Sequence, residues 1–166
     1  MPRGELNESG YFGIGVLHSK TPYNIGTLWR SAYQLGASFI FTIASRDKFK
    51  GGDTVAATER LPFYDHNNWG DFVTSAPEGA QWVAVEMGGT PLDEFEHPSK
   101  AIYLLGSEDN GLPRAVLTAC HKIVSLRCEN YASYNVAVAG SIVLYDRLEK
   151  ERKKHVTEKE DSQAPQ

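Results

Sequence analysis

This 166-residue chain has only two cysteines, no long apolar run and little excess charge, and each shortage excludes a class of protein. Cys120 and Cys128 fall short of the four ligands of a typical structural zinc site, and the five histidines show no ligand spacing. No stretch approaches the ~18 apolar residues of a membrane-spanning helix, and the amino-terminal residues lack the apolar core of a signal peptide. We therefore expect a cytoplasmic protein without a metal ion or a membrane partner.

The net charge of −4 argues against a uniformly basic nucleic-acid-binding protein, but the charge is unevenly distributed. Residues 61–113 carry one basic side chain, Lys100, and nine acidic ones, whereas the segments on either side are slightly basic. A local basic face can therefore coexist with an acidic middle segment. Mixed charge spread over a solvated surface explains the same distribution equally well.

Apolar runs typical of strands alternate with the 3.6-residue spacing typical of helices. Strands are expected over residues 11–17, 39–43, 61–64, 82–87, 101–105 and 123–126, with a turn at 88–91. Helices are expected over residues 24–36, 67–75, 114–119 and 135–150. This alternation predicts an α/β fold with a mainly parallel sheet and helices on both faces.

The length and composition fit one domain, which we place at residues 11–150. Residues 1–10 are expected to be loose, and residues 151–166 are expected to form a charged, disordered tail. The segment from Val136 to Tyr145 is apolar nearly all round, and a helix of that kind must be buried on every side. In so short a chain, that pattern predicts a subunit interface.

Three polar clusters follow predicted strands, and polar loops at strand ends are where open α/β sheets build their sites. The clusters are Asn24-x-Gly26-x-x-x-Arg30, Gly106-Ser107-Glu108-Asp109-Asn110-Gly111-Leu112-Pro113 and Ser133-Tyr134-Asn135-Val136-Ala137-Val138-Ala139. Arg30 points away from the apolar stripe of its helix and reaches over Gly26, where the missing side chain leaves room for a substrate. Glu108 could accept hydrogen bonds from loop amides or pair with Arg30. Ser133 and Asn135 have the side chains of helix caps.

In this order the clusters resemble the three motifs of the SpoU (TrmH-type) branch of the SPOUT RNA methyltransferases, over roughly residues 12–148. The resemblance implies a 2′-O-ribose methyltransferase that uses S-adenosylmethionine and acts on tRNA or rRNA. It also implies a homodimer and a deep trefoil knot in the carboxyl-terminal part. We expect a minimal member of the family, without an added RNA-binding domain.

The resemblance assigns roles to individual residues. The implied catalytic residues are Asn24, Arg30, Glu108, Ser133 and Asn135, with Arg30 binding RNA phosphate and helping to remove the ribose 2′-OH proton. The implied cofactor-binding positions are Glu86, Met87, Gly106, Leu126 and Tyr134. The chain departs from the family pattern where Leu126-Arg127-Cys128 replaces Ile-Pro-Met and where Tyr134 replaces leucine. Both departures fall on the expected cofactor contacts.

Two other functions compete with this interpretation. A non-catalytic RNA-binding protein could keep the same fold, although joint retention of four residues argues against it: Arg30, Glu108, Ser133 and Asn135. A nucleotide-dependent oxidoreductase is suggested by Gly13-Ile14-Gly15, but residue 18 is histidine rather than the third glycine of that fingerprint.

Overall fold

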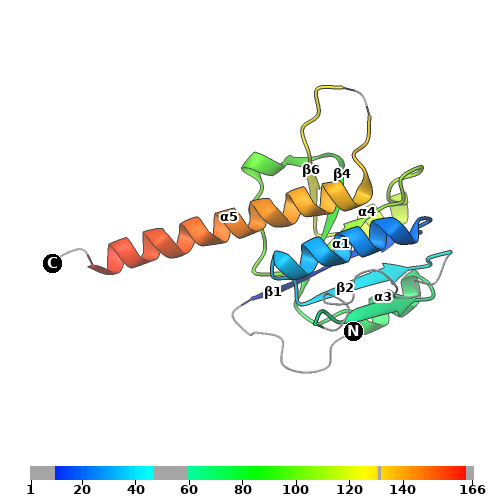
Figure 1. The fold of residues 1–166 in the computed structure, drawn as a ribbon, viewed down its shortest axis with the longest axis horizontal. Helices are drawn as coiled ribbons and strands as arrows, with labels where there is room; N and C mark the ends of the chain where they lie inside the picture. The colour runs from blue at the N-terminus through cyan, green and yellow to red at the C-terminus, as the bar shows by residue number, and fades with distance from the viewer. Residues whose placement is uncertain (1–9, 47–59, 131, 164–166) are drawn as a thin grey trace.

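In the computed structural model, residues 10–46, 60–130 and 132–163 are described, and they form a six-stranded sheet flanked by helices (Figure 1). The strands are β1 (Tyr11–Leu17), β2 (Phe39–Ile43), β3 (Phe63–His66), β4 (Gln81–Pro91), β5 (Lys100–Leu105) and β6 (Lys122–Ser125). Their order is β3-β2-β1-β5-β4-β6, and each neighbouring pair is parallel. The predicted mainly parallel α/β fold is therefore confirmed. Strand order does not test the predicted trefoil knot or the domain boundaries, which stay predictions.

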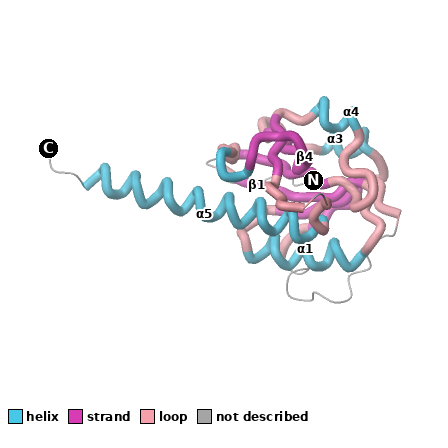
Figure 2. The backbone as a smooth tube through the Cα atoms, turned by 90° about the horizontal axis from the view of Figure 1, so that it is seen from above, coloured by secondary structure: helices cyan, strands magenta, loops and turns pink. Residues whose placement is uncertain are grey.

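Helices cover both faces of the sheet, as expected (Figure 2). The helices are α1 (Pro22–Gln34), α3 (Trp69–Ser75), α4 (Arg114–Ala119) and α5 (Val136–Gln163), with a short 3₁₀ turn, η1 (Leu92–Glu94), after β4. Leu28 of α1 and Leu144 of α5 are fully buried in the core on one face, whereas Phe72 of α3 belongs to the core on the other. The alternation of apolar residues and glycines in β1 follows from this two-sided packing.

Glycine in β1 is required by close packing rather than by backbone conformation. A Cβ atom at Gly13 would lie 2.1 Å from the Phe39 ring, and one at Gly15 would lie 2.4 Å from the Phe41 ring. The two phenylalanine rings therefore occupy the face of β1 that carries no side chains. Strand β5 is buried on both faces from Ala101 to Leu105, as its unbroken apolar run predicts.

Several element ends differ from the sequence prediction. The turn expected at Gly88–Pro91 is part of β4, whose pairing with β6 shifts register between Val85 and Thr90, as at a bulge. The glycines there allow an irregular strand instead of ending it. β3 is Phe63–His66 rather than 61–64. α1 begins at Pro22, which stands in the first turn where its missing N–H is harmless.

The expected disordered tail is wrong for residues 151–163, because α5 continues to Gln163 instead of ending near Lys150. This part of the helix projects beyond the body of the molecule (Figures 1 and 2). Lysine, glutamate and arginine are good helix formers, and an i,i+3 ion pair such as Lys154–Glu151, at 3.9 Å, adds a little support. Only Gly10 of the expected loose amino-terminal segment lies within the described residues.

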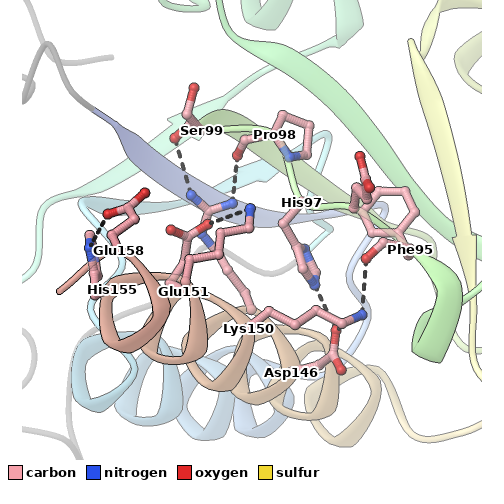
Figure 3. Close-up of polar contacts among 12 residues, drawn as sticks. Phe95, His97, Pro98, Ser99, Asp146, Lys150, Glu151, His155 and Glu158 are labelled. Atoms are coloured by element: carbon pink, nitrogen blue, oxygen red, sulfur yellow. Dashed lines mark hydrogen bonds and ion pairs between the residues drawn. The ribbon is translucent and has the colours of Figure 1, made fainter. Parts of the chain in front are cut away.

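The middle of α5 is fixed to the segment before β5 by a polar cluster (Figure 3). Arg147, 5% exposed, donates from Nη1 to the Pro98 carbonyl at 2.6 Å and from Nη2 to the Ser99 carbonyl at 3.1 Å. His97 lies between the Tyr103 hydroxyl, 2.6 Å from Nδ1, and an Asp146 carboxylate oxygen, 2.8 Å from Nε2. These contacts hold the helix against one end of the sheet.

Within this chain α5 is covered on one side only, so the prediction that its apolar segment is buried all round holds for half of the helix. Val143 and Leu144 are fully buried against the sheet. Val138, Ile142 and Tyr145 are 47%, 37% and 57% exposed. The apolar side chains of α5 therefore divide into a core-facing set and a solvent-facing set.

Candidate functional site

The three sequence motifs meet at the carboxyl edge of the central strands. β1 and β5 are adjacent and parallel, with Val16 opposite Leu105, so the segments that follow them leave the sheet at the same edge. β4 pairs with β5 up to Val85, which brings Glu86 and Met87 to that edge as well. The third motif arrives from β6 and enters α5. This is the place where parallel α/β sheets carry their sites.

A chain of side-chain hydrogen bonds joins one residue from each motif. The amide nitrogen of Asn24, only 8% exposed, donates to Oε1 of Glu108. Nδ2 of Asn135 donates to Oδ1 of Asn24 at 3.0 Å. The question left open for Glu108 is thereby answered: among the described residues its side chain pairs with Asn24, not with Arg30.

Asn135 also caps α5, as its residue type predicts. Its Oδ1 accepts hydrogen bonds from the backbone nitrogens of Ala137 at 2.9 Å and Val138 at 3.3 Å. The alternative cap, Ser133, is exposed and lies along a neighbouring cavity instead. The cap and the three-motif hydrogen-bond chain therefore share one amide, which links the start of α5 to α1.

A cavity of about 430 Å³ lies beside this hydrogen-bond chain. All five predicted cofactor positions line it, together with two of the predicted catalytic residues: Glu86, Met87, Gly106, Leu126, Tyr134, Glu108 and Ser133. Its size is in the range of small-molecule sites, roughly 300–1,000 Å³. Of the other predicted catalytic residues, Asn24 and Asn135 connect to the cavity through Glu108. Arg30 is exposed on α1, is not part of the cavity wall and has no ion-pair partner within the described ranges.

The cavity combines an apolar surface with carboxylates. Val85, Leu105 and Val136 supply apolar surface that can take a flat ring. Glu86 has a structural task, because Oε1 accepts from the backbone nitrogen of Met87 and Oε2 from that of Leu112, each at 3.0 Å. Sequence reasoning did not find this task, since nothing in the sequence shows which loop amides need an acceptor.

A second carboxylate at the cavity is already paired. The Lys20 ammonium donates to Asp109 and lowers the pKa of this carboxyl group below its usual value. Lys20 lies in the segment between β1 and α1, so this ion pair joins the segment that precedes the first motif to the second motif. Glu108 also lines the cavity, where it accepts a hydrogen bond from Asn24 and has no ion-pair partner among the described residues.

The glycines of the second motif allow its loop to turn tightly. A Cβ atom at Gly106 would lie 2.1 Å from the carbonyl carbon of Gly111. Gly111 has φ +62°, a conformation that favours glycine, and Ser107 pairs with it in an isolated antiparallel bridge. The loop therefore folds back on itself, and its own backbone fills the space.

The two departures from the family pattern contact each other. The Tyr134 hydroxyl donates to the carbonyl oxygen of Arg127 at 2.8 Å. The guanidinium of Arg127 donates to both carboxylate oxygens of Asp93 at 3.0 Å and to Glu94 at 3.2 Å. Asp93 and Glu94 carry no motif, and sequence reasoning missed them because their partner lies on another element.

Two absences apply to the part of the chain that the structure describes. Its helices include none with the length and apolar character needed to cross a bilayer. Within the same residues, no three His, Cys, Asp or Glu side chains gather in a way that could hold a metal ion.

The chain is similar to several RNA methyltransferases. It is 25% identical over 136 residues to the 23S rRNA (guanosine-2′-O-)-methyltransferase RlmB of Nitrosomonas europaea, covering 76% of this chain and 52% of that protein. It is 30% identical to an uncharacterized tRNA/rRNA methyltransferase of Mycobacterium sp., covering 74% of this chain and 41% of that protein. The chain thus spans about half, or less, of the length of these relatives.

Solved structures share the fold. An AdoMet-bound rRNA methyltransferase from Sinorhizobium meliloti superposes with a TM-score of 0.73 at 26% identity, covering 84% of this chain and 56% of that one. The SpoU methyltransferase AviRb from Streptomyces viridochromogenes gives 0.77 at 22% identity, covering 87% and 61%. Residues 13–145 match the SpoU rRNA Methylase family, and the chain belongs to that family.

Proposed function

We propose that this chain is an S-adenosylmethionine-dependent 2′-O-ribose methyltransferase acting on tRNA or rRNA in the cytoplasm. The observation that carries the proposal is the hydrogen-bond chain Asn135–Asn24–Glu108, which joins all three motifs beside a cavity of cofactor size. The names of its relatives, which include rRNA and tRNA/rRNA methyltransferases, support the substrate class.

The cavity is chemically suited to S-adenosylmethionine. Leu105, Leu126 and Val136 offer apolar surface for an adenine ring, and Glu108 offers negative charge for a cationic ligand. Gly106 and the Gly111 backbone form a tight loop that presents main-chain groups to the cavity. When bound, S-adenosylmethionine supplies the methyl group that the ribose oxygen accepts.

The protein's own residues would orient the RNA and assist removal of the ribose 2′-OH proton. The exposed Arg30 is free to bind a phosphate, and fork-like pairing of a guanidinium with phosphate oxygens gives a defined geometry. A guanidinium keeps its proton at neutral pH, so it cannot act as a base by itself. Proton removal from the ribose hydroxyl would therefore need the bound phosphate near Arg30.

Asn135 would act as a hydrogen-bond donor to the substrate. Its Oδ1 already accepts from two backbone nitrogens, and one hydrogen of its amide nitrogen goes to Asn24. One amide hydrogen remains, because the side-chain amide of asparagine carries two. That hydrogen can bind a ribose oxygen beside the cavity.

We also propose a homodimer. The solvent-facing stripe of α5, defined as Val138, Ile142, Tyr145 and Leu148, recurs at helical spacing. An apolar hollow of about 510 Å³ runs along it between Leu35, Leu92 and Ile142. A second copy of the chain that packs its own α5 here would cover both features, as the apolar sequence of the helix predicts.

Two measurements test this function. Isothermal calorimetry should show S-adenosylmethionine binding to the purified protein, and tritiated cofactor should label tRNA or rRNA at ribose 2′ positions. Mapping of ribose methylation in RNA from cells lacking the gene would identify the nucleotide. RNA binding without cofactor binding would instead support the non-catalytic RNA-binding alternative.

A further inference from the structure

The cavity wall between β6 and α5 is tied to the 3₁₀ turn η1, which directly follows β4. Arg127, two residues after β6, makes a two-pronged ion pair with Asp93 and a further contact with Glu94. Tyr134, just before α5, donates its hydroxyl proton to the Arg127 carbonyl at 2.8 Å. We call these four residues the clasp. It brings together the two ends of the yellow segment that leads from β6 to α5 in Figure 1.

Both ends of the clasped segment form part of the cavity wall. Leu126 and Cys128 flank Arg127, and Ser133 precedes Tyr134, and all of these line the cavity except Arg127 itself. The Tyr134 ring therefore forms part of the wall, while its hydroxyl bonds the backbone of Arg127 rather than a ligand. A shift of the Arg127 carbonyl would move Leu126 and Tyr134 together.

The turn that receives the clasp is itself anchored. Lys150 of α5 donates to the carbonyls of Leu92 and Phe95, at 2.5 and 2.9 Å, on either side of Asp93 and Glu94. Ser125 donates to the Gly89 carbonyl at 3.0 Å, which holds β6 to the irregular part of β4. The clasp thus connects the cavity wall formed by Leu126 and Tyr134 to a turn that Lys150 of α5 holds in place.

The ion pairs of the clasp are exposed, so their effect on position can be distinguished from an effect on stability. The side chains of Arg127, Asp93 and Glu94 are 68%, 62% and 65% exposed. Exposed ion pairs add little to the free energy of unfolding. Their geometric effect on a short segment does not depend on burial.

We infer that Arg127, Asp93 and Tyr134 are positioning residues that preset the cavity wall for the cofactor. The inference rests on the proposed function, because it assumes that S-adenosylmethionine binds in this cavity. It predicts that weakening the clasp lowers cofactor affinity while leaving the fold intact.

The experiment compares Tyr134→Phe and Asp93→Asn with the wild type by calorimetry, using S-adenosylmethionine as the probe. Loss of one hydrogen bond to the wall should weaken binding about three- to tenfold, and loss of the exposed ion pair about two- to fivefold. The double variant should show less than the product of the two effects, because both contacts fix the same backbone unit. For Asp93→Asn, the kcat measured at saturating cofactor should stay near the wild-type value.

Matched controls remove the same chemical groups elsewhere. Tyr64→Phe deletes a hydroxyl on β3 at the opposite edge of the sheet, and Arg152→Gln breaks an exposed ion pair on the projecting part of α5. Neither should change the affinity. Hydrogen exchange of the ligand-free protein adds a second readout, in which the amides around Arg127 and Tyr134 should exchange faster in both clasp variants.

The outcomes separate the inference from the proposed function. A wild-type protein that gives no heat with S-adenosylmethionine contradicts the proposed function and removes the inference with it. A wild type that binds, with unchanged affinity and unchanged exchange in both clasp variants, overturns the inference alone. Weaker binding accompanied by global unfolding in Tyr134→Phe would also overturn it, because positioning should leave the fold intact.

Discussion

Asn135 and Asn24 lie 111 residues apart in the sequence, yet Nδ2 of Asn135 donates to Oδ1 of Asn24 at 3.0 Å. The same Asn24 side chain donates to Glu108, so each end of its amide holds a different motif. Asn24 has little exposed surface, which means that water cannot readily replace either partner. The arrangement of all three motifs therefore depends on one amide that presents a donor to one side and an acceptor to the other.

Asn24→Asp tests this dependence with almost no change in shape. The new carboxylate would face Glu108 where an N–H stood, and we expect the free energy of unfolding to fall by about 1–3 kcal/mol at neutral pH. Protonation of the new carboxyl group restores a donor, so the loss should shrink below roughly pH 5. Chemical denaturation at both pH values measures it. Equal losses at both would show that this amide does not need its donor.

Arg30→Ala should remove methyl transfer without disturbing the fold. Arg30 is exposed and lies off the buried stripe of α1, so the free energy of unfolding should change by less than about 0.5 kcal/mol. Turnover should fall on the order of 10²–10⁴-fold if Arg30 positions the phosphate and assists proton removal. Arg114→Ala, at another exposed arginine, is the control. Near-normal turnover in Arg30→Ala would remove this residue from the mechanism.

Gly106→Ala should unfold the second-motif loop, and Gly106→Val should do so more severely. The added Cβ atom meets the Gly111 backbone, which cannot rotate away as a side chain can, so we expect a loss of about 1–3 kcal/mol and greatly weakened S-adenosylmethionine binding.

Gly36→Ala provides the control for Gly106. It is strained only by its φ of +84° and lies far from the cavity wall, so it should lower stability and keep cofactor affinity. Calorimetry on both variants decides the matter. Normal affinity in Gly106→Val would place the cofactor elsewhere.

Ile142→Glu and Val143→Glu should fail in different ways, although they are neighbours on α5. Ile142 belongs to the solvent-facing stripe, so its variant should stay folded and sediment as a monomer. Val143 is fully buried in the protomer, so an unpaired charge there should cost several kcal/mol, of the order of 3–5, and unfold it. Sedimentation and circular dichroism separate the two. A wild type that is monomeric at micromolar concentration with full activity contradicts the proposed homodimer.

Acid should weaken the contact between α5 and the segment before β5. Burial, reinforced by Arg147 and Lys150, lowers the pKa of His97 below its ordinary 6.5, although Asp146 opposes the shift. Arg147 donates to the Tyr103 hydroxyl at 3.2 Å, which leaves the hydroxyl proton to bond Nδ1 and leaves Nε2–H to bond Asp146. The folded protein therefore prefers neutral His97.

The sign of the pH effect follows from that preference. The unfolded state takes up the proton first, so the stability linked to His97 is full above pH 6.5 and is lost as the pH falls through the lowered folded pKa. Unfolding free energies measured between roughly pH 7 and pH 5, before most carboxylates titrate, should show this decline. His97→Gln should flatten it. Burial also lowers the pKa of His66, so His66→Gln should remove only the part of the decline in stability that His66 contributes.

Much of the fold could be predicted because local sequence carried the signal. The apolar run of β5 predicts a strand buried on both faces, and α4 has the predicted bounds, Arg114–Ala119. The continuation of β4 through Gly88 and Gly89 could not be predicted, because glycines that favour a turn also permit a bulge. The full length of α5 was missed for a related reason: charged residues suit both a solvated helix and a disordered tail.

The sequence by itself determined the order of strands and helices and the three motifs that the chain shares with its family. Their residue types and spacing are local properties, and periodicity reports them directly. Only the tertiary structure decided that Asn24 joins Glu108 to Asn135, that Glu86 holds loop amides, and that Tyr134 closes on Arg127. The contacts of Asn24 and Glu86 join residues from different segments of the chain, and the Tyr134 contact closes one loop. The packing of parallel strands brings those segments together, and a single sequence does not record which partners then meet.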